Sequence, residues 1–221
     1  MSGGGEIFDV IRGGDTERLR EILAADPAAA GARNERGHSA LLIAQYHHKK
    51  EMVALLLAAE PELDIFDAAS VGRAERVTHL LDRDPGLRDA WSSDGFAPLH
   101  LAAFFGYPEV VRLLLARGAG MNPVARNPMK VQPLHSAAAD GHGEVARLLV
   151  EAGAEVNARQ EGGWTPLHAA AKNADVEMVR LLLAHGADPL AKTDEGKSAI
   201  GIAAEGGNLD LLRVLKAQQR S

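Results

Sequence analysis

Apolar residues along the chain come in short clusters that fit helices of two or three turns, separated by glycine and proline. Residues 94–122 show the pattern most clearly. Pro98 suits the first turn of a helix because its fixed φ is already helical. Gly106 and Pro108 interrupt that helix, and residues 110–115 are apolar over most of a second one. The pattern predicts two short helices, whose apolar surface needs a neighbour of the same kind on each side.

Two further segments carry the same pattern. Residues 128–157 and 161–190 each repeat a Pro-Leu-His triplet, a small-residue helix and a leucine-rich helix. The histidine of the triplet falls at His100, His135 and His168, at spacings of 35 and 33 residues. Repetition at a fixed period of 20–50 residues indicates a stack of similar units rather than a globular core.

These units resemble the ankyrin repeat. The period near 33 residues, the complete Thr165-Pro-Leu-His168 motif and the Leu-Leu-Leu-x-x-Gly-Ala endings carry the resemblance. A weaker copy puts Gly201 at the histidine position. The resemblance implies an all-α ankyrin-repeat solenoid of about seven helix-turn-helix repeats with short β-hairpin fingers between neighbours.

The N-terminal part repeats less clearly. Residues 6–27 match residues 64–85 at an offset of 58, which aligns Phe8 with Phe66 and puts both at the histidine position, as core residues. Only 24 residues then separate repeats 2 and 3, so the finger between them is predicted to be missing, with a short turn at 60–63. The predicted single domain, 1–221, has repeats at about 6–35, 36–60, 61–93, 94–127, 128–160, 161–193 and 194–219.

Three expectations about local structure follow from this alignment. Leu114 and Leu148 should be core residues of the leucine-rich helices. Lys130 occupies the position of the turn glycine in its finger, and a lysine is costly at positive φ. We therefore expect an altered turn in that finger. Residues 1–5 should lie outside the array.

Composition narrows the classes of function. The chain has 221 residues, no cysteine and a formal net charge of −6. Absence of cysteine excludes disulfides and thiolate zinc sites, and the acidic balance without basic clusters argues against nucleic acid. No basic segment followed by an apolar run marks a signal peptide, and no apolar stretch approaches the roughly 20 residues of a spanning helix. We expect a cytoplasmic protein with no membrane partner.

The candidate chemistry is sparse. In the ankyrin family the histidine of the Pro-Leu-His triplet bonds to neighbouring backbone, so the row of three is read as structural rather than as a metal site. His47 and His48 are the better ligand pair, but adjacent helical residues point about 100° apart. No serine, glycine-rich or carboxylate arrangement forms a catalytic constellation. The prediction is a non-enzyme with no cofactor and no metal.

Aromatic residues are concentrated in one repeat. They make up 4% of the chain, yet five of the nine fall within residues 91–107. Exposed aromatic side chains often dominate interface energy. Family resemblance adds the finger tips and the exposed side of the first helix as contact positions. The predicted partner-binding residues are Trp91, Phe96, Phe104, Phe105, Val131, Asp140, Trp164, Lys172, Asn173, Tyr46 and His47.

The predicted function is protein–protein interaction, of the scaffold kind, through the concave face of fingers and first helices, centred on repeat 4. Two alternatives remain. The aromatic patch could be a homodimer interface of a structural protein, although a monomer is expected. A small molecule or metal could bind near His47, His48 and the gap between repeats 2 and 3. Phe104 and Phe105 could also fill that gap as local core rather than face a partner.

Overall fold

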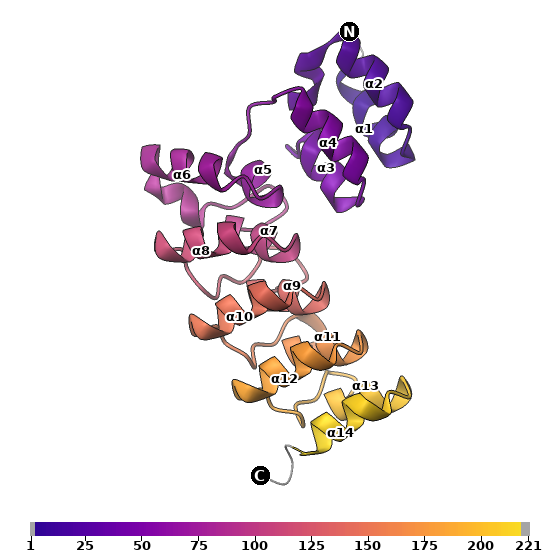
Figure 1. Ribbon diagram of the computed structural model, residues 1–221, viewed down its shortest axis with the longest axis vertical. Coiled ribbons are helices and arrows are strands. Elements are labelled where there is room, and N and C mark those ends of the chain that lie inside the picture. The colour runs from indigo at the N-terminus through magenta and orange to yellow at the C-terminus, as the bar shows by residue number, and fades with distance from the viewer. Residues whose placement is uncertain (1–2, 218–221) are drawn as a thin grey trace.

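The computed structural model describes residues 3–217, which form an elongated stack of short helices (Figure 1). Helices come in pairs joined by tight turns, and the two ends of the chain lie at opposite ends of the stack. The described part contains no β-sheet, only isolated bridges between Arg33 and Ser39 and between Lys192 and Ser198. The fourteen α-helices of this part are α1 (Gly3–Gly13), α2 (Thr16–Ala25), α3 (Ala40–Tyr46), α4 (Lys50–Ala58), α5 (Ile65–Ser70), α6 (Ala74–Arg83), α7 (Pro98–Phe104), α8 (Pro108–Ala116), α9 (Pro133–Ala139), α10 (Gly143–Glu151), α11 (Pro166–Lys172), α12 (Val176–Ala184), α13 (Ala199–Glu205) and α14 (Leu209–Ala217).

Three short 3₁₀ helices complete the regular structure, at Pro27–Gly31, Pro85–Asp89 and Glu161–Gly163. Helix α1 begins at Gly3, earlier than the expected start at residue 6. The last two residues of the seventh expected repeat, 218–219, lie outside the described residues.

The helices divide into two groups. The N-terminal block (residues 3–59) contains α1–α4, and the C-terminal block (residues 64–217) contains α5–α14. Each has its own cluster of buried apolar side chains, one built mainly from residues 7–56 and the other mainly from residues 65–215. In Figure 1 the C-terminal block is a regular column, while the N-terminal block is set to one side of its top and tilted.

Packing between neighbouring pairs explains this division. In the C-terminal block α5 packs closely on α7, α7 on α9, and α9 on α11, and the second helices α6 to α14 form a parallel column. Across the boundary, α3 contacts α5 only along a short stretch, whereas α4 packs against α2 within the N-terminal block. Residues 60–64 cross from α4 to α5 without an assigned helix or strand. The regular stack therefore starts at α5.

The leucine register differs by one residue from the sequence alignment in one repeat. Leu114 is fully buried, as expected, but Leu148 is only half-buried and its neighbour Leu149 is the fully buried one. Leu149 lies 14 residues after His135, just as Leu114 lies 14 after His100. The prediction for Leu148 was wrong because two leucines stand side by side and the choice between them ignored this spacing.

The finger at Lys130 keeps the turn of the preceding finger but is closed by a different hydrogen bond. Lys130 adopts a φ of 50°, in the left-handed region, and its N–H donates to the Asn127 carbonyl at 3.2 Å. Gly95 makes the equivalent bond to Ser92 in the preceding finger with a φ of 81°. The preceding finger is closed by a bond from the Ser92 N–H to the Phe96 carbonyl, at 2.9 Å, whereas the equivalent Val131 carbonyl accepts from Ala125, at 2.8 Å, two residues further from the turn. The expected alteration is therefore found in the bond that closes the finger, while Lys130 accepts the strained backbone of the turn residue.

Candidate functional site

Buried histidines fix three of the first helices of the C-terminal block, α7, α9 and α11. In α7, His100 accepts at Nδ1 from the N–H of Ala97, at 3.1 Å, and donates from Nε2 to the Val131 carbonyl, at 3.0 Å. These bonds join the start of α7 to the finger that follows it in the next repeat. Burial lowers the pKa of His100 to about 4, against the smaller effect of the carbonyls of Val131 and Pro123, so the ring is neutral at pH 7.

His135 and His168 repeat this arrangement. His135 donates to the Ala158 carbonyl at 3.0 Å, and His168 donates to that of Ala191 at 3.0 Å. Burial lowers the pKa of both, to about 4 for His135. The expected structural role of the Pro-Leu-His histidine is confirmed in these three repeats.

Asp67 takes the histidine position in α5. The N-cap of α5 is Asp64, so the third residue of the helix is Asp67, whereas the alignment had put Phe66 there. Asp67 is 2% exposed, and Phe66 is only half-buried, so the assignment of Phe66 was wrong. Phe8, which had been placed at the corresponding position, is buried at 3% exposure.

A polar network joins the two blocks through Asp67. Arg33 donates from Nη2 to Asp67 Oδ2 at 2.7 Å and lies 2.8 Å from Asp64 Oδ2, while Ser39 Oγ donates to the other oxygen of Asp67. Burial and the neighbouring Asp64 raise the pKa of Asp67, opposed by the Ser39 hydroxyl and the Arg33 guanidinium. Side chains thus make the connection that backbone bonds between fingers make further along the stack, such as that from the Arg126 N–H to the Gly95 carbonyl at 2.8 Å.

Tyr46 makes the second connection between the blocks. Its hydroxyl donates to Asp94 Oδ2 at 2.7 Å. Its ring lies 6.3 Å from that of Phe104 and 5.7 Å from that of Phe105, centroid to centroid. Burial, followed by the nearby Asp94, raises the pKa of Tyr46. An aromatic residue at the end of α3 is therefore held against the end of α7.

A groove opens where these rings meet α9. Its volume is about 370 Å³, and its walls come from α3, α7 and α9 and from the fingers that precede α7, α9 and α11. Of the predicted site residues it contains Tyr46, Phe96, Phe104, Val131 and Asp140. The other lining residues are Ala139, which directly precedes the predicted Asp140, and six that sequence reasoning had missed: His100, Leu101, Met129, His135, Ser136 and Gln160.

The sequence could have indicated some of the missed lining residues but not others. Met129 stands at the finger tip directly before the turn residue and is 51% exposed, so an apolar residue in a polar turn could have indicated it. Leu101 and Ser136 sit inside apolar or small-residue runs and carry no signal that separates lining from core.

The remaining predicted residues lie outside the groove. Phe105 packs against the buried cluster of the C-terminal block, which agrees with its reading as local core. The Trp91 ring is covered by the Arg126 guanidinium, 4.3 Å from its centroid. The others are Trp164, whose ring lies 5.6 Å from Lys172 Nζ, Lys172 itself, Asn173, whose amide donates to the Ala139 carbonyl at 2.5 Å, and the exposed His47.

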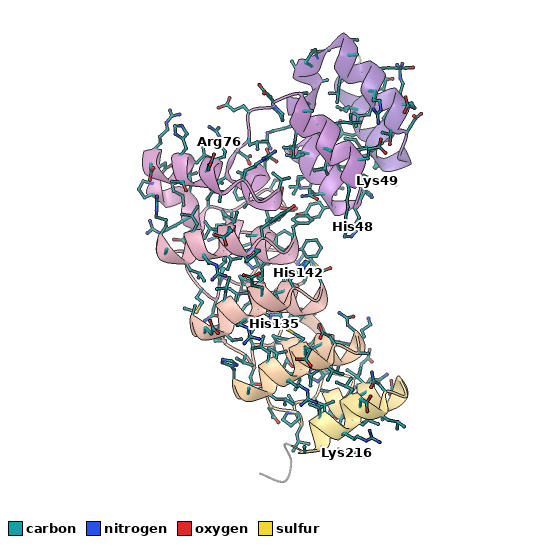
Figure 2. The ribbon with its side chains drawn as sticks, in the orientation of Figure 1. His48, Lys49, Arg76, His135, His142 and Lys216 are labelled. Carbon is teal, nitrogen blue, oxygen red and sulfur yellow. The ribbon has the colours of Figure 1, made fainter. Side chains whose placement is uncertain are left out.

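Asp140 is the acidic group at the rim of the groove. It follows the last residue of α9 and is solvent-exposed. Partial burial raises the pKa of Asp140, opposed by charge on His142 and His48. Figure 2 shows His48 at the lower end of the N-terminal block, facing the side of the column where His142 lies. The two blocks therefore approach each other around this rim.

Metal sites and membrane spans are two further features that bear on function. Within residues 3–217 no three His, Asp or Glu side chains gather in a way that could hold a metal ion. No helix of the same span has the length and apolar character needed to cross a membrane.

Comparison with known proteins defines the class. The family model described as "Ankyrin repeats (3 copies)" matches residues 65–160 and 158–220, more than half of the chain. The chain therefore belongs to the ankyrin repeat family, whose repeats generally mediate protein–protein interaction. The matched region begins at Ile65, the first residue of α5.

Individual relatives are much longer proteins. The E3 ubiquitin-protein ligase hecd-1 of Caenorhabditis elegans is 35% identical over 121 residues, 49% of this chain and 4% of its own length. The E3 ubiquitin-protein ligase KEG of Arabidopsis thaliana is 36% identical over 135 residues, 52% of this chain and 8% of its own. Ankyrin repeat and SAM domain-containing protein 6 of Danio rerio is 36% identical over 59 residues, which are 27% of this chain and 8% of its own length. The chain spans less than a tenth of the length of each.

Proposed function

We propose that this chain is a non-catalytic protein-binding module of seven ankyrin repeats, with no finger between repeats 2 and 3, that binds its partner in the groove between α3, α7 and α9. The observation that carries the proposal is the groove itself, whose walls include Tyr46, Phe96 and Phe104. An exposed apolar recess lined by aromatic side chains is the feature that most often marks a protein-interaction site. We propose a cytoplasmic monomer as the binding form.

Some predicted residues line the groove and others lie outside it, and this division narrows the position proposed for the partner. Trp91 and Trp164 already have a cation over their rings. Contact with these faces would require a partner to displace Arg126 or Lys172, so neither ring is an anchor in this proposal. The partner is centred on α7 and α9, and Lys172 and Asn173 contribute at the edge, where charges affect orientation and association rate more than affinity.

Truncation of Phe104 tests the proposal most cleanly. Phe96 and Phe105 also pack against the buried cluster, whereas Phe104 contacts mainly Tyr46 and Phe105 at the surface. A partner is first isolated from the native host with the whole chain as bait and identified by mass spectrometry. Its affinity is then measured for the natural chain, for Phe104→Ala and for Trp164→Ala as the matched aromatic control.

The expected result separates binding from folding. Loss of a central aromatic anchor costs about 2 kcal/mol of binding, roughly thirtyfold in affinity. Phe104→Ala should show this loss with a small change in the urea midpoint, and Trp164→Ala should bind nearly as the natural chain does. Equal affinity for the natural chain and Phe104→Ala would place the partner elsewhere. A mass in solution that doubles with concentration would instead favour the homodimer alternative.

A further inference from the structure

The groove has few polar atoms with which to recognise a ligand. Both ring nitrogens of His100 are engaged with backbone, and His135 likewise accepts from the Gln132 N–H and donates to the Ala158 carbonyl. Neither ring has a free nitrogen to offer a ligand. The floor of the groove is therefore apolar in practice, although two histidines line it.

Asp140 is different from these histidines. It lines the groove, and its carboxylate makes no side-chain hydrogen bond or ion pair with another residue in the described part of the chain. It also stands at the carboxyl end of α9, where the helix dipole is negative and favours a cation nearby. The structure thus places an acidic group without a partner beside an apolar recess.

The cations of this face are engaged away from Asp140. Arg126 lies over Trp91, Lys172 over Trp164, and Lys130 Nζ is 3.3 Å from Glu161 Oε2. His48 and His142 are the charged or titratable groups that act on Asp140. Of these, His142 already donates from Nε2 to the Phe104 carbonyl at 2.9 Å. The net charge of −6 adds a long-range attraction for a cationic partner.

Building on the proposed function, we propose that the groove takes a protein segment with one large apolar side chain and, within a few residues of it, a lysine or arginine that pairs with Asp140. The apolar side chain sits between Tyr46, Phe96 and Phe104, and the cation at the end of α9. An acidic or uncharged segment would leave Asp140 desolvated without compensation, which disfavours it. The preference for a basic residue depends on Asp140, and it is a separate claim from the proposal that a partner binds the concave face.

A selection from random peptides tests the proposal and does not require the partner to be identified. A phage-displayed library is selected on the whole chain, and enriched peptides are synthesised with a fluorophore. Polarisation then gives their affinity for the natural chain, Phe104→Ala, Asp140→Asn and Asp140→Lys. Asp194→Asn is the matched control, since Asp194 is exposed and pairs with Arg159, at 2.9 Å, away from the groove.

The expected pattern has three parts. Enriched peptides share an aromatic or aliphatic residue with a nearby lysine or arginine. Asp140→Asn weakens them about fivefold, the upper range for a partly exposed ion pair, and the loss shrinks at high salt, while Asp194→Asn has no effect. Asp140→Lys prefers the peptide in which the basic residue is replaced by glutamate.

Other outcomes separate the two proposals. If peptides need Phe104 but lack a basic residue, the inference about the cation is wrong. The same holds if they bind Asp140→Asn as well as the natural chain. In both cases the groove remains the proposed binding site. If enriched peptides bind Phe104→Ala unchanged, the groove is wrong as the site. If no peptide is enriched, the inference is also overturned, because a linear segment does not suffice; the partner affinities for Phe104→Ala still decide the proposed function.

Discussion

The two blocks solve the same stacking problem by different means. In the C-terminal block, each histidine of the Pro-Leu-His triplets donates to a carbonyl of the next finger, and apolar side chains form one continuous cluster. At the boundary with the N-terminal block, side chains make the contacts, among them Arg33 and Ser39 with Asp67, Tyr46 with Asp94, and Gln45 with the Ser70 carbonyl. The match to the family model begins at α5, the first helix of the C-terminal block.

The difference teaches what the finger contributes. The alignment left about nine residues too few between repeats 2 and 3 for a finger, and side chains bridge the boundary instead. Because side-chain pairs constrain orientation less than a repeated backbone connection, the N-terminal block can sit at a different angle (Figure 1). That angle brings Tyr46 over Phe104 and completes the groove.

The largest expected effect on stability comes from truncating one fully buried leucine, first in one block and then in the other. Leu56 in the N-terminal block and Leu114 in the C-terminal block are both fully buried. Each change to alanine should cost about 2–5 kcal/mol. Both tryptophans, Trp91 and Trp164, belong to the C-terminal block. Urea unfolding followed by tryptophan fluorescence therefore reports on that block, whereas far-ultraviolet circular dichroism reports on all helices.

The two variants should respond differently. In Leu56→Ala the circular dichroism transition should begin at lower urea than the fluorescence transition, and in Leu114→Ala fluorescence should shift fully. Coincident transitions in both variants would show one cooperative unit and remove the distinction between the blocks.

Acidification should weaken the C-terminal block selectively. The pKa values of His100 and His135 are lowered to about 4 in the folded state, below the ordinary value of 6.5. The unfolded chain therefore binds protons first, so stability is lost as the pH falls from about 6.5 toward 4 and is unaffected above that range. At pH 5 the loss is about 2 kcal/mol for each histidine. Fluorescence-detected urea midpoints at pH 7 and pH 5 measure it.

Replacement of His135 by glutamine provides the control for this prediction. The variant should be less stable at pH 7 but should lose less stability between pH 7 and pH 5 than the natural chain does. An identical pH dependence in the two chains would show that His135 does not carry the effect.

Removal of Arg33 should loosen the boundary. Arg33→Ala leaves the buried Asp67 carboxylate with the Ser39 hydroxyl alone. Because the Arg33 side chain is 40% exposed, the expected cost is at the low end of that for stranding a buried charge, about 1–2 kcal/mol. The pKa of Asp67 is raised in the folded state, so the cost is present above that pKa and shrinks as the pH falls through it. Arg36→Ala, exposed on the same turn, is the control, and urea melts at several pH values give the comparison.

The smallest expected effect concerns the finger at Lys130. Lys130→Gly should raise stability by about 1 kcal/mol, because glycine adopts a positive φ without steric cost and Lys130 has a φ of 50°. The ion pair with Glu161 joins two exposed side chains and adds little. A fluorescence-detected melt should show a higher midpoint than the natural chain. An unchanged or lower midpoint would mean that the turn is not strained in solution.

Sequence reasoning predicted the helix pairs of the C-terminal block because its motifs fix their register. It placed Phe66 where Asp67 belongs, since the N-terminal copies lack the triplet and the 58-residue offset alone cannot fix a position within a turn. At the site, contact positions inferred from the family included Phe96, Phe104, Val131 and Asp140, which line the groove. The cations over Trp91 and Trp164 come from neighbouring segments and depend on the folded geometry.

The central claim is that the partner occupies the groove where the two blocks meet, and protection of a single thiol tests it most directly. The natural chain has no cysteine, so Met129→Cys at the lip, 51% exposed, and Leu209→Cys on the last helix, 68% exposed, each give one reactive group. The rate of reaction with a thiol reagent is measured with and without saturating partner. The account predicts that the partner slows the Met129→Cys reaction at least about tenfold, an order-of-magnitude figure for burial of an exposed side chain, and leaves Leu209→Cys unchanged. An unchanged rate at Met129→Cys under saturation would contradict it.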